Sequence, residues 1–477
     1  MLNAAMAWDW WTLRATRRTP NERLANEIVS FVLVVALMVF ATVAGIRRLF
    51  DPNQDPQAHA LGETAMIETD FEARCGPASA DPYIVTWVHA PELDDWIGPA
   101  STAFMRACPN TQIRLVSLDD LDAAKRIAAG ELEPTVWTPS DSAMLDYLEA
   151  RGQRYGAELD IERSASLVRT PMVLLIWEDR VEPLDHLLAS GLEGERGLAD
   201  SVCAGIEGAG LDAAALDGLD VEAMVPARWE TLWRAAHPAP MQLPPEPSLD
   251  ALERWGRVRV AHASPIEAPR GLFALYLISR EFLDPEGLLD GPGVAEAIHE
   301  RRELLERWLR RCEAGLPAPL PSGRLLTETM FNLGDPGADP EGFDAVITDE
   351  HLAFGVLDRM NAHEGSIRPA RIVYPHSSMV LDYPVAIFAG ASTEVEGSAT
   401  RFAGYLRSPE LQERALELGF RPVNSAVSLH DYDRGPNPFT SLRRHGVVLE
   451  PDWREVPRTQ GAGLIELVDL WSAATGR

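Results

Sequence analysis

Two hydroxyl side chains, Thr138 and Ser140, follow a short apolar run and stand where a helix is predicted to begin. Hydroxyl groups and the free backbone N–H groups at the start of a helix can hold an anionic or polar group. The alternative is that these residues serve the helix alone, with Ser140 or Asp141 as its cap. We therefore expect Thr138 and Ser140 to bind a small polar or anionic ligand, and capping is the competing interpretation.

A second set of polar side chains follows the apolar run at 257–261 in the same way. Ser264 lies just after this run, and Arg270 comes shortly after it. A guanidinium group can pair with a carboxylate or another oxyanion through two parallel hydrogen bonds. We expect both residues to contribute to ligand binding. The alternative for Arg270 is an ion pair at the surface.

Three histidines, His89, His262 and His376, each follow a predicted strand. Three neutral imidazoles would suit zinc or another transition metal. No acidic residue can be identified from the sequence as a further metal ligand. We therefore predict no metal site and assign His89 and His262 to the ligand-binding residues.

Motifs that would carry catalysis are absent from the sequence. It holds no Gly-x-Ser-x-Gly elbow, no His-Glu-x-x-His helix, no phosphate-binding loop and no dinucleotide fingerprint. We predict that the protein is not an enzyme and needs no cofactor.

From Tyr83 onward, short apolar runs alternate with segments of helical periodicity. The predicted strands lie at 83–88, 112–117, 135–137, 257–261, 343–348 and 385–388. Predicted helices between and after them include 92–108, 118–129, 271–282, 293–314, 350–360, 393–406, 408–418 and 463–473. Such alternation indicates a parallel sheet covered on both faces, and ligands bind such sheets at the carboxyl ends of the strands.

The apolar run from Leu167 to Trp177 is interrupted by Thr170 and Pro171. Proline cannot donate a hydrogen bond to a neighbouring strand, so this strand should lie at an edge or change direction there. A strand that leaves one sheet for another would do so.

An uncharged apolar run at 28–46 precedes these elements, and its 19 residues include twelve Ile, Val, Leu or Phe. At about 1.5 Å per residue a helix of this length reaches roughly 28 Å, enough to cross a bilayer. More arginines precede the run than follow it, which places the N-terminus in the cytoplasm. We predict a short cytoplasmic segment at 1–27, a transmembrane helix at 28–46 and a stalk at 47–80. A cleaved signal peptide is the alternative.

The net charge of the 477-residue chain is −29. Nucleic-acid binding is therefore not expected, because it needs a basic patch on the protein. The four cysteines have none of the short spacings of zinc or redox motifs. In an oxidising compartment we expect Cys75 to pair with Cys108, and buried free thiols are the alternative.

Several stretches, taken in order, resemble extracytoplasmic solute-binding proteins with the type II periplasmic-binding fold, in the branch often associated with von Willebrand A domains. The resemblance covers about residues 83–475. The stretches that carry it are Pro134–Ser140, Leu167–Val173 with Trp177-Glu178, Val260–Pro265, Tyr374-Pro375, Tyr383–Ala386 and Gly419–Pro422.

This resemblance implies an α/β protein of two lobes that hold a ligand in the cleft between them. Lobe one would comprise 81–167 and 378–477, and lobe two 168–377. The hinge would lie at Thr170-Pro171 and at the return near Tyr374-Pro375, so Thr170 and Tyr374 join the predicted ligand-binding residues. Binding to both lobes would favour the closed state.

The predicted function is that of a membrane-anchored solute-binding protein for transport or sensing, with its C-terminal domain periplasmic or extracellular. A membrane transporter or a von Willebrand A protein is the possible partner. The turn at 266–270 departs from the hydroxyl-rich turn of many relatives, so the ligand familiar from them need not bind here. The alternative function is a scaffold protein of the same fold that has lost ligand binding.

Overall fold

The computed structural model describes Cys75, Ala78 and residues 81–157, 159–189, 228–230, 233, 249–284, 287–334, 342–363, 365–430 and 436–477. The predicted cytoplasmic segment at 1–27 and transmembrane helix at 28–46 lie outside these residues, as does nearly all of the predicted stalk at 47–80. Among the helices that are described, none combines the length and the apolar composition that crossing a bilayer requires.

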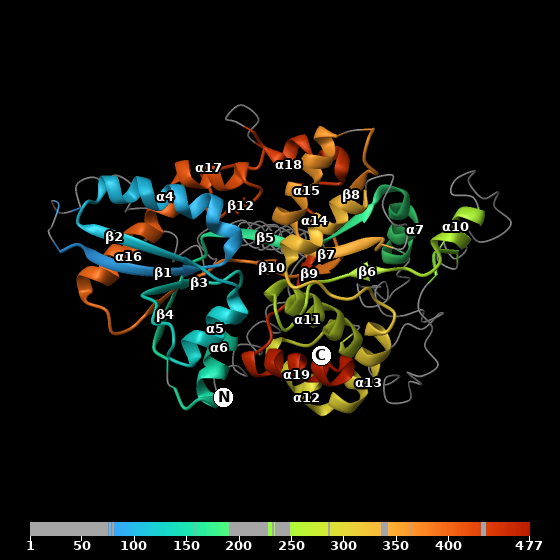
Figure 1. Cartoon of the computed structure of the whole chain (residues 1–477), viewed down its shortest axis with the longest axis horizontal. Helices are drawn as coiled ribbons and strands as arrows, with labels where there is room; N and C mark the ends of the chain where they lie inside the picture. Colours follow the sequence, from blue (N-terminus) through green and yellow to red (C-terminus); the bar gives the residue numbers. More distant parts are fainter. Residues whose placement is uncertain are drawn as a thin grey trace, which may run out of the picture. The chain divides into compact units, whose positions relative to one another are not determined.

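The first sheet has five strands in the order β2-β1-β3-β11-β4 (Figure 1). Its strands are β1 (Tyr83–His89), β2 (Thr111–Ser117), β3 (Val136–Thr138), β4 (Ile161–Ser164) and β11 (Val385–Phe388). The pairs of β1 with β2 and with β3 are parallel, whereas β11 runs antiparallel to both β3 and β4. The prediction of a parallel sheet therefore holds for β1 to β3 and is wrong for β11, which enters from far along the chain.

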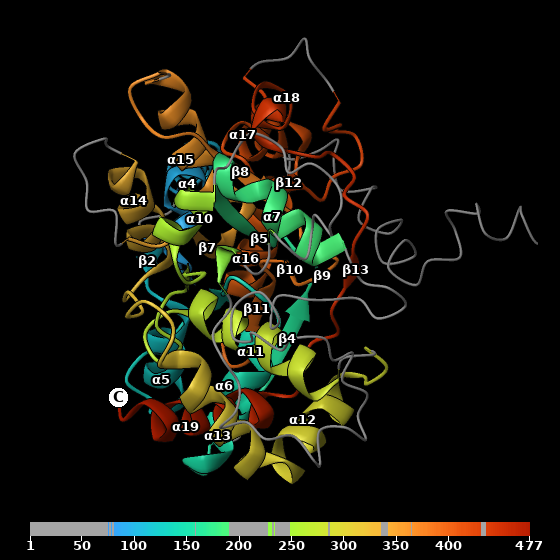
Figure 2. The ribbon, with the colours of Figure 1, turned by 90° about the vertical axis from the view of Figure 1, so that its right-hand side faces the viewer.

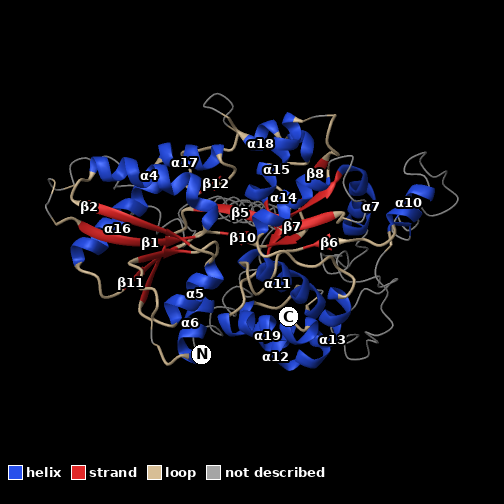
Figure 3. Cartoon of the chain, viewed as in Figure 1, coloured by secondary structure: helices blue, strands red, loops and turns tan. Residues whose placement is uncertain are grey.

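Helices pack on this sheet, and together they form the first lobe (Figure 3). They are α4 (Asp94–Ala107), α5 (Asp120–Ala128), α6 (Ala143–Arg154), α16 (Thr393–Leu406) and α17 (Pro409–Glu417). Aromatic contacts join α16 to β1 and α4 to α16: the rings of Trp87 and Phe402 meet edge to face at 5.0 Å, and Phe104 lies 5.1 Å from Phe402. Such contacts favour one fixed packing of helix on sheet.

A single long strand, β5 (Val168–Trp177), leads from the first sheet into the second. Up to Pro171 it pairs with β12 (Arg421–Pro422) and β10 (Val380–Leu381), and from Met172 it pairs with β7 and β8. The proline thus stands where the strand changes partners, as its missing N–H predicts. At the short strand β10 the chain returns from the second lobe to the first.

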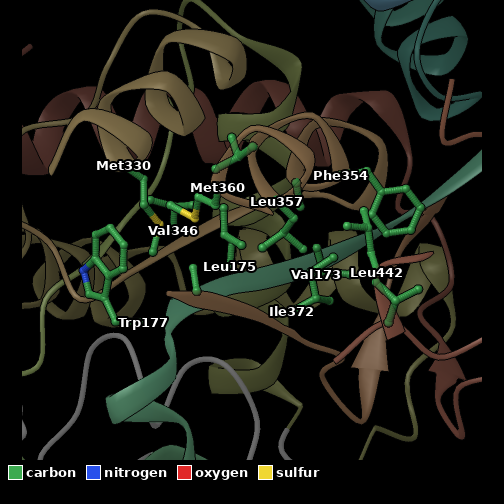
Figure 4. Close-up of a cluster of buried hydrophobic side chains, with 14 of the residues drawn as sticks. Val173, Leu175, Trp177, Met330, Val346, Phe354, Leu357, Met360, Ile372 and Leu442 are labelled. Atoms are coloured by element: carbon green, nitrogen blue, oxygen red, sulfur yellow. The ribbon is translucent and has the colours of Figure 1, made fainter. Parts of the chain in front are cut away.

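The second sheet joins β5 to β6 (Val260–Ala261), β7 (Ala345–Asp349) and β8 (Ala370–Val373). Helices of this second lobe are α7 (Glu178–Ala189), α10 (Leu249–Trp255), α11 (Pro269–Leu283), α12 (Gly291–Glu300), α13 (Arg302–Glu313), α14 (Gly323–Leu333) and α15 (Glu350–Ala362). Side chains of the sheet meet α14 and α15 in a buried core (Figure 4) that includes Val173, Leu175, Val346, Ile372, Leu357, Met360 and Met330. The two-lobed α/β architecture is confirmed.

The C-terminal segment contacts both lobes. Phe439 of α18 (Pro438–Ser441) and Leu442, which precedes η7 (Arg443–His445), join the core of the second lobe. Farther on, β13 (Arg454–Glu455) pairs with β9 (Ser377–Ser378). The last helix, α19 (Gly461–Thr475), packs against α6 of the first lobe and against α12 and α13 of the second (Figures 1 and 2). The lobe limits given above stay a prediction, and these contacts place part of 378–477 beside the second lobe.

A disulfide bond joins Cys75 to Cys108 at the end of α4. This pairing is the one expected from the sequence. Cys312 is disulfide-bonded as well. Disulfides persist in oxidising compartments, so this bond agrees with a place outside the cytoplasm.

Candidate functional site

Arg270, the second residue of α11, links groups from both lobes and is only 2% exposed. Its Nε donates to the carboxylate of Asp349 at the end of β7, and its Nη2 donates to the Tyr383 hydroxyl over 2.9 Å. Its Nη1 lies 3.1 Å from Oε1 of Glu92. Glu92 belongs to η4 (Pro91–Leu93), the turn that follows β1 in the first lobe. Arg270 is therefore a buried interlobe group, and the alternative of a surface ion pair is wrong.

Two glycines lie in close contacts beside this arginine. An ideal Cβ on Gly271 would lie 2.2 Å from the Ala263 carbonyl oxygen, so α11 begins directly against the turn after β6. An ideal Cβ on Gly323 would lie 2.6 Å from Cδ of Arg270. The Gly323 position therefore leaves room for the Arg270 side chain, and the Gly271 position lets α11 begin close to the turn.

Replacing Gly271 by alanine should destabilise the protein by about 1–3 kcal/mol, because the added methyl group overlaps backbone atoms that cannot swing aside. Urea unfolding checks this value. Gly355→Ala in α15 is the matched control, because its Cβ would meet nothing within 4 Å. There the better helix propensity of alanine should stabilise the protein by about 0.5–1 kcal/mol. Equal effects of the two substitutions would show that the close approach at Gly271 is unimportant.

Tyr383 is the non-glycine residue with positive φ, at 41°, among those the structure describes. Its backbone N–H donates to the Ser140 carbonyl oxygen over 3.2 Å, and its carbonyl accepts from the Leu167 N–H over 3.0 Å. A non-glycine residue in this region costs on the order of 1–3 kcal/mol and persists where its surroundings hold it. These backbone hydrogen bonds hold Tyr383, whose hydroxyl accepts from Arg270.

Thr138 and Ser140 are fully buried, and each has an internal partner. The Thr138 hydroxyl accepts from the Trp87 indole N–H over 3.1 Å. The Ser140 N–H and hydroxyl both donate to Oδ2 of Asp120, over 2.9 and 2.5 Å. At the start of α6, Oδ1 of Asp141 accepts from the Ala143 N–H. The residue at the N-cap position is Ser142, which makes no side-chain capping hydrogen bond, so neither Ser140 nor Asp141 is the N-cap.

Two neighbouring carboxyl groups beside this turn have raised pKa values. Burial raises the pKa of Asp120 to about 8, and the charges of Asp119 and Glu92 add to the effect. Burial likewise raises the pKa of Asp119 to about 7. Desolvation penalises the ionised form of a carboxyl group. Oδ1 of Asp120 is buried without a hydrogen-bond partner.

The pKa of Asp120 predicts how stability depends on pH. Its folded pKa of about 8 lies above the ordinary value of 3.8. The folded state therefore keeps a proton that the unfolded chain releases, and stability falls as pH rises between these values. The loss is about 1.4 kcal/mol per pH unit for one proton.

Urea unfolding at pH 5, 6, 7 and 8 should show a shallower fall in stability for Asp120→Asn than for the unchanged protein. Asp122→Asn, on the same helix but exposed and 3.7 Å from Arg126, is the control and should keep the original pH dependence. Identical pH dependence in all three proteins would contradict the assignment.

The other residues predicted to bind ligand also have internal partners. Thr170 accepts from the His351 N–H over 3.1 Å, and the Tyr374 hydroxyl donates to Oε1 of Glu350 over 2.5 Å. Ser264 is buried in the turn after β6, where its N–H donates to the Leu320 carbonyl oxygen. None of these contacts involves Arg270.

The two predicted histidines are each held by a neighbouring carbonyl oxygen. Nδ1 of His89 lies 3.0 Å from the Ala90 oxygen, and burial lowers the pKa of His89. Nδ1 of His262 lies 2.7 Å from the Ala263 oxygen, and its Nε2 lies 3.1 Å from Oε1 of Glu313. Burial alone would lower the pKa of His262, but the charge and hydrogen bond of Glu313 outweigh it and raise that pKa. Within the described residues, no group of three or more His, Cys, Asp or Glu is arranged to hold a metal ion.

Sequence reasoning missed Glu92, Asp349, Asp120 and Tyr383. Asp349 ends a strand, and Glu92 lies in the turn after one, so the strand-end rule that selected Thr138 applies to both. From the sequence we expected hydroxyls and histidines at these strand ends, whereas the partners of Arg270 in the structure are mainly acidic. A second contact between the two lobes also involves the turn before α11. Nζ of Lys125 in α5 donates to the Ile266 carbonyl oxygen over 3.4 Å.

Comparison with known proteins gives one family and several solved structures. Residues 85–421 match the family model of bacterial extracellular solute-binding proteins. The chain is similar to the sulfate-binding protein SubI from Mycobacterium tuberculosis, with 14% identity, coverage of 81% of this chain and 98% of that chain, and a TM-score of 0.42. It is similar to a periplasmic thiamin binding protein, with 12% identity, 84% and 99% coverage and a TM-score of 0.47. For the ferric binding protein from Campylobacter jejuni these values are 11%, 82%, 99% and 0.44. No curated protein sequence matches the chain.

Proposed function

The chain belongs to the family of bacterial extracellular solute-binding proteins, and from this premise we propose that it holds a small polar or anionic ligand between its two lobes, for transport or sensing. Members of this family are solute-binding proteins, which supports the proposal that the chain binds a solute and catalyses no reaction. In the proposal, the ligand lies at Arg270, and the type II form of the periplasmic-binding fold brings the two lobes together around it.

The observation that carries this proposal is the interlobe contact of Arg270. Its guanidinium comes from the second lobe and reaches Glu92 in the first lobe, while Asp349 and Tyr383 hold its other nitrogens. A fixed arginine is suited to a carboxylate or another oxyanion, because its planar fork matches their geometry. A ligand held there touches groups of both lobes and favours their contact by its differential affinity.

Ser140 and Thr170 support the ligand position indirectly in this proposal. Ser140 is bonded to Asp120 and, through its carbonyl oxygen, to the backbone of Tyr383. Thr170 holds the start of α15, which begins directly after Asp349. The Ser140 carbonyl oxygen therefore helps to position Tyr383, and the Thr170 hydroxyl helps to position the start of α15 beside Asp349. Thr138, His89, His262, Ser264 and Tyr374 remain candidates as predicted from the sequence.

We also propose that the protein is a single-pass protein of the cytoplasmic membrane, anchored by the helix predicted at 28–46, with residues 81–477 outside the cytoplasm. A stalk at 47–80 would keep the binding lobes close to the membrane and raise their effective concentration near a membrane transporter. Mass spectrometry of the mature N-terminus tests the anchor. An intact N-terminus supports it, and cleavage after the apolar run contradicts it.

Thermal-shift screening of the purified full-length protein tests ligand binding. The panel contains carboxylates, sulfate, phosphate, amino acids, sugars and divalent metals. A reproducible shift that is lost in Arg270→Lys supports the proposal, since lysine keeps the charge but not the fork. Arg310→Lys, which changes a half-exposed arginine of α13, is the matched control and should keep the shift.

The alternative function is a scaffold that retains the fold, has lost ligand binding and works with membrane or von Willebrand A partners. The observation that favours it is that Thr138, Ser140, Thr170 and Tyr374 all have internal hydrogen-bond partners. The scaffold predicts no thermal shift across the whole panel.

A further inference from the structure

Glu92 is the least firmly held partner of Arg270. One of its oxygens lies 3.1 Å from Nη1 of Arg270, and its other oxygen is buried with no hydrogen-bond partner. A buried acceptor without a partner costs about 1–3 kcal/mol. The side chain is 11% exposed and stands in a single turn of 3-10 helix. Glu92 can therefore move away from Arg270 with little loss of other contacts.

The remaining partners of Arg270 are fixed by their own surroundings. Asp349 is fully buried, and its second oxygen accepts from the Leu352 N–H at the start of α15. Tyr383 is fully buried and is held by backbone hydrogen bonds on both sides. When Glu92 moves away, Arg270 stays in place with its Nη1 edge directed at the first lobe.

We infer that the Glu92 carboxylate occupies the place of a ligand carboxylate on Arg270, and that the ligand is a small monocarboxylate that displaces it. This inference rests on the proposed function and specifies its ligand class. Glu92 then sets specificity, because a solute binds only when it pairs with Arg270 better than this residue does.

The charges around Arg270 favour a single negative charge on the ligand. Asp349 stays bonded to Nε, so a dianion such as sulfate would bring a second negative charge into a buried place that already holds one carboxylate. Like charges in such surroundings repel strongly. A monocarboxylate keeps the charge that Glu92 supplies in the unliganded arrangement.

Calorimetric titration of full-length protein with acetate, succinate, sulfate and putrescine tests the inference in wild type and Glu92→Gln. Glutamine keeps the size of the side chain and removes its charge. If Glu92 leaves Arg270 about one tenth of the time, its loss should tighten acetate binding about tenfold. Glu131→Gln, an exposed glutamate of the same lobe, is the control and should leave the affinity unchanged. In Glu92→Gln with Arg270→Lys the gain should vanish.

Three outcomes decide the matter. Tighter acetate binding in Glu92→Gln with little gain for sulfate or putrescine supports the inference. Wild-type binding of any of these solutes without a gain in Glu92→Gln overturns the inference and leaves the proposed function intact. A lack of binding by both proteins across this panel and the wider thermal-shift panel overturns both.

Discussion

Replacing Arg270 by alanine is expected to lower the free energy of unfolding by about 3–5 kcal/mol, because the substitution leaves a buried carboxylate without its counter-ion. Asp349 is fully buried, and its Oδ2 loses the donor that Arg270 supplies. The Tyr383 hydroxyl loses its partner as well. Urea unfolding followed by circular dichroism measures the loss.

Arg310→Ala is the matched control for this experiment. Arg310 pairs with Glu306 in α13 and is 56% exposed, so its removal should cost no more than about 1 kcal/mol. The double variant Arg270→Met with Asp349→Asn removes both charges together and should recover part of the stability lost by Arg270→Met alone. If Arg270→Ala were as stable as Arg310→Ala, Arg270 could not be the buried interlobe ion described above.

Replacing Arg458 by alanine should produce the second large effect, a loss of about 3 kcal/mol. Arg458 lies just before α19 and makes a two-pronged contact with the fully buried Asp141, with two distances of 2.9 Å. Its Nη2 also donates to the Val380 carbonyl oxygen of β10 over 2.7 Å. Burial raises the pKa of Asp141 to about 7 although Arg458 lowers it. Without the arginine, this carboxyl group would be buried with less compensation.

The surroundings of Arg458 explain why its loss should also free the C-terminal segment. The Tyr276 hydroxyl of α11 donates to the Pro457 carbonyl oxygen over 2.5 Å, and the Thr459 hydroxyl donates to the Gly291 oxygen of α12 over 3.1 Å. An ideal Cβ on Gly461 would lie 1.9 Å from the Asp146 oxygen of α6. The segment therefore contacts both lobes, and Arg458 supplies a buried charged contact with the first.

Limited trypsin digestion with mass spectrometry measures this release. Arg458→Ala should give new cleavage within 443–477, together with the loss of stability. Arg302→Ala, which removes a 56% exposed arginine 3.9 Å from Glu466 of α19, should give neither effect. Unchanged stability and unchanged cleavage in Arg458→Ala would show that the ion pair with Asp141 does not fasten the segment.

Local hydrophobic patterns predicted most helices and strands of the fold, because the periodicity of a strand or a helix depends on neighbouring residues. The sheet change at Pro171 was also predictable, since it follows from a missing N–H group. The antiparallel direction of β11 was not, because the pattern of Val385–Phe388 is the same in either direction. The contact of the C-terminal segment with the first lobe depends on Arg458 and Asp141, which are 317 residues apart in sequence. No local sequence pattern predicts such a contact.

The site could be predicted in part. Arg270 and Ser140 were found because they follow strands, and the strand-end rule concerns position alone. The rule does not show which hydroxyls are already used inside the protein. Thr138 is bonded to Trp87, and Tyr374 to Glu350. Glu92 was not predicted from the sequence, because its role depends on an arginine of the other lobe.

The most direct test of a ligand held at Arg270 is calorimetric titration of the strongest-binding solute of the thermal-shift panel into full-length wild type and Arg270→Lys. Circular dichroism verifies that both proteins are folded under the conditions used. We predict saturable one-to-one binding by the wild type and a loss of at least about tenfold in affinity for the lysine variant, because the ammonium group cannot reproduce the planar fork. Equal affinities in the two folded proteins would contradict the proposed site.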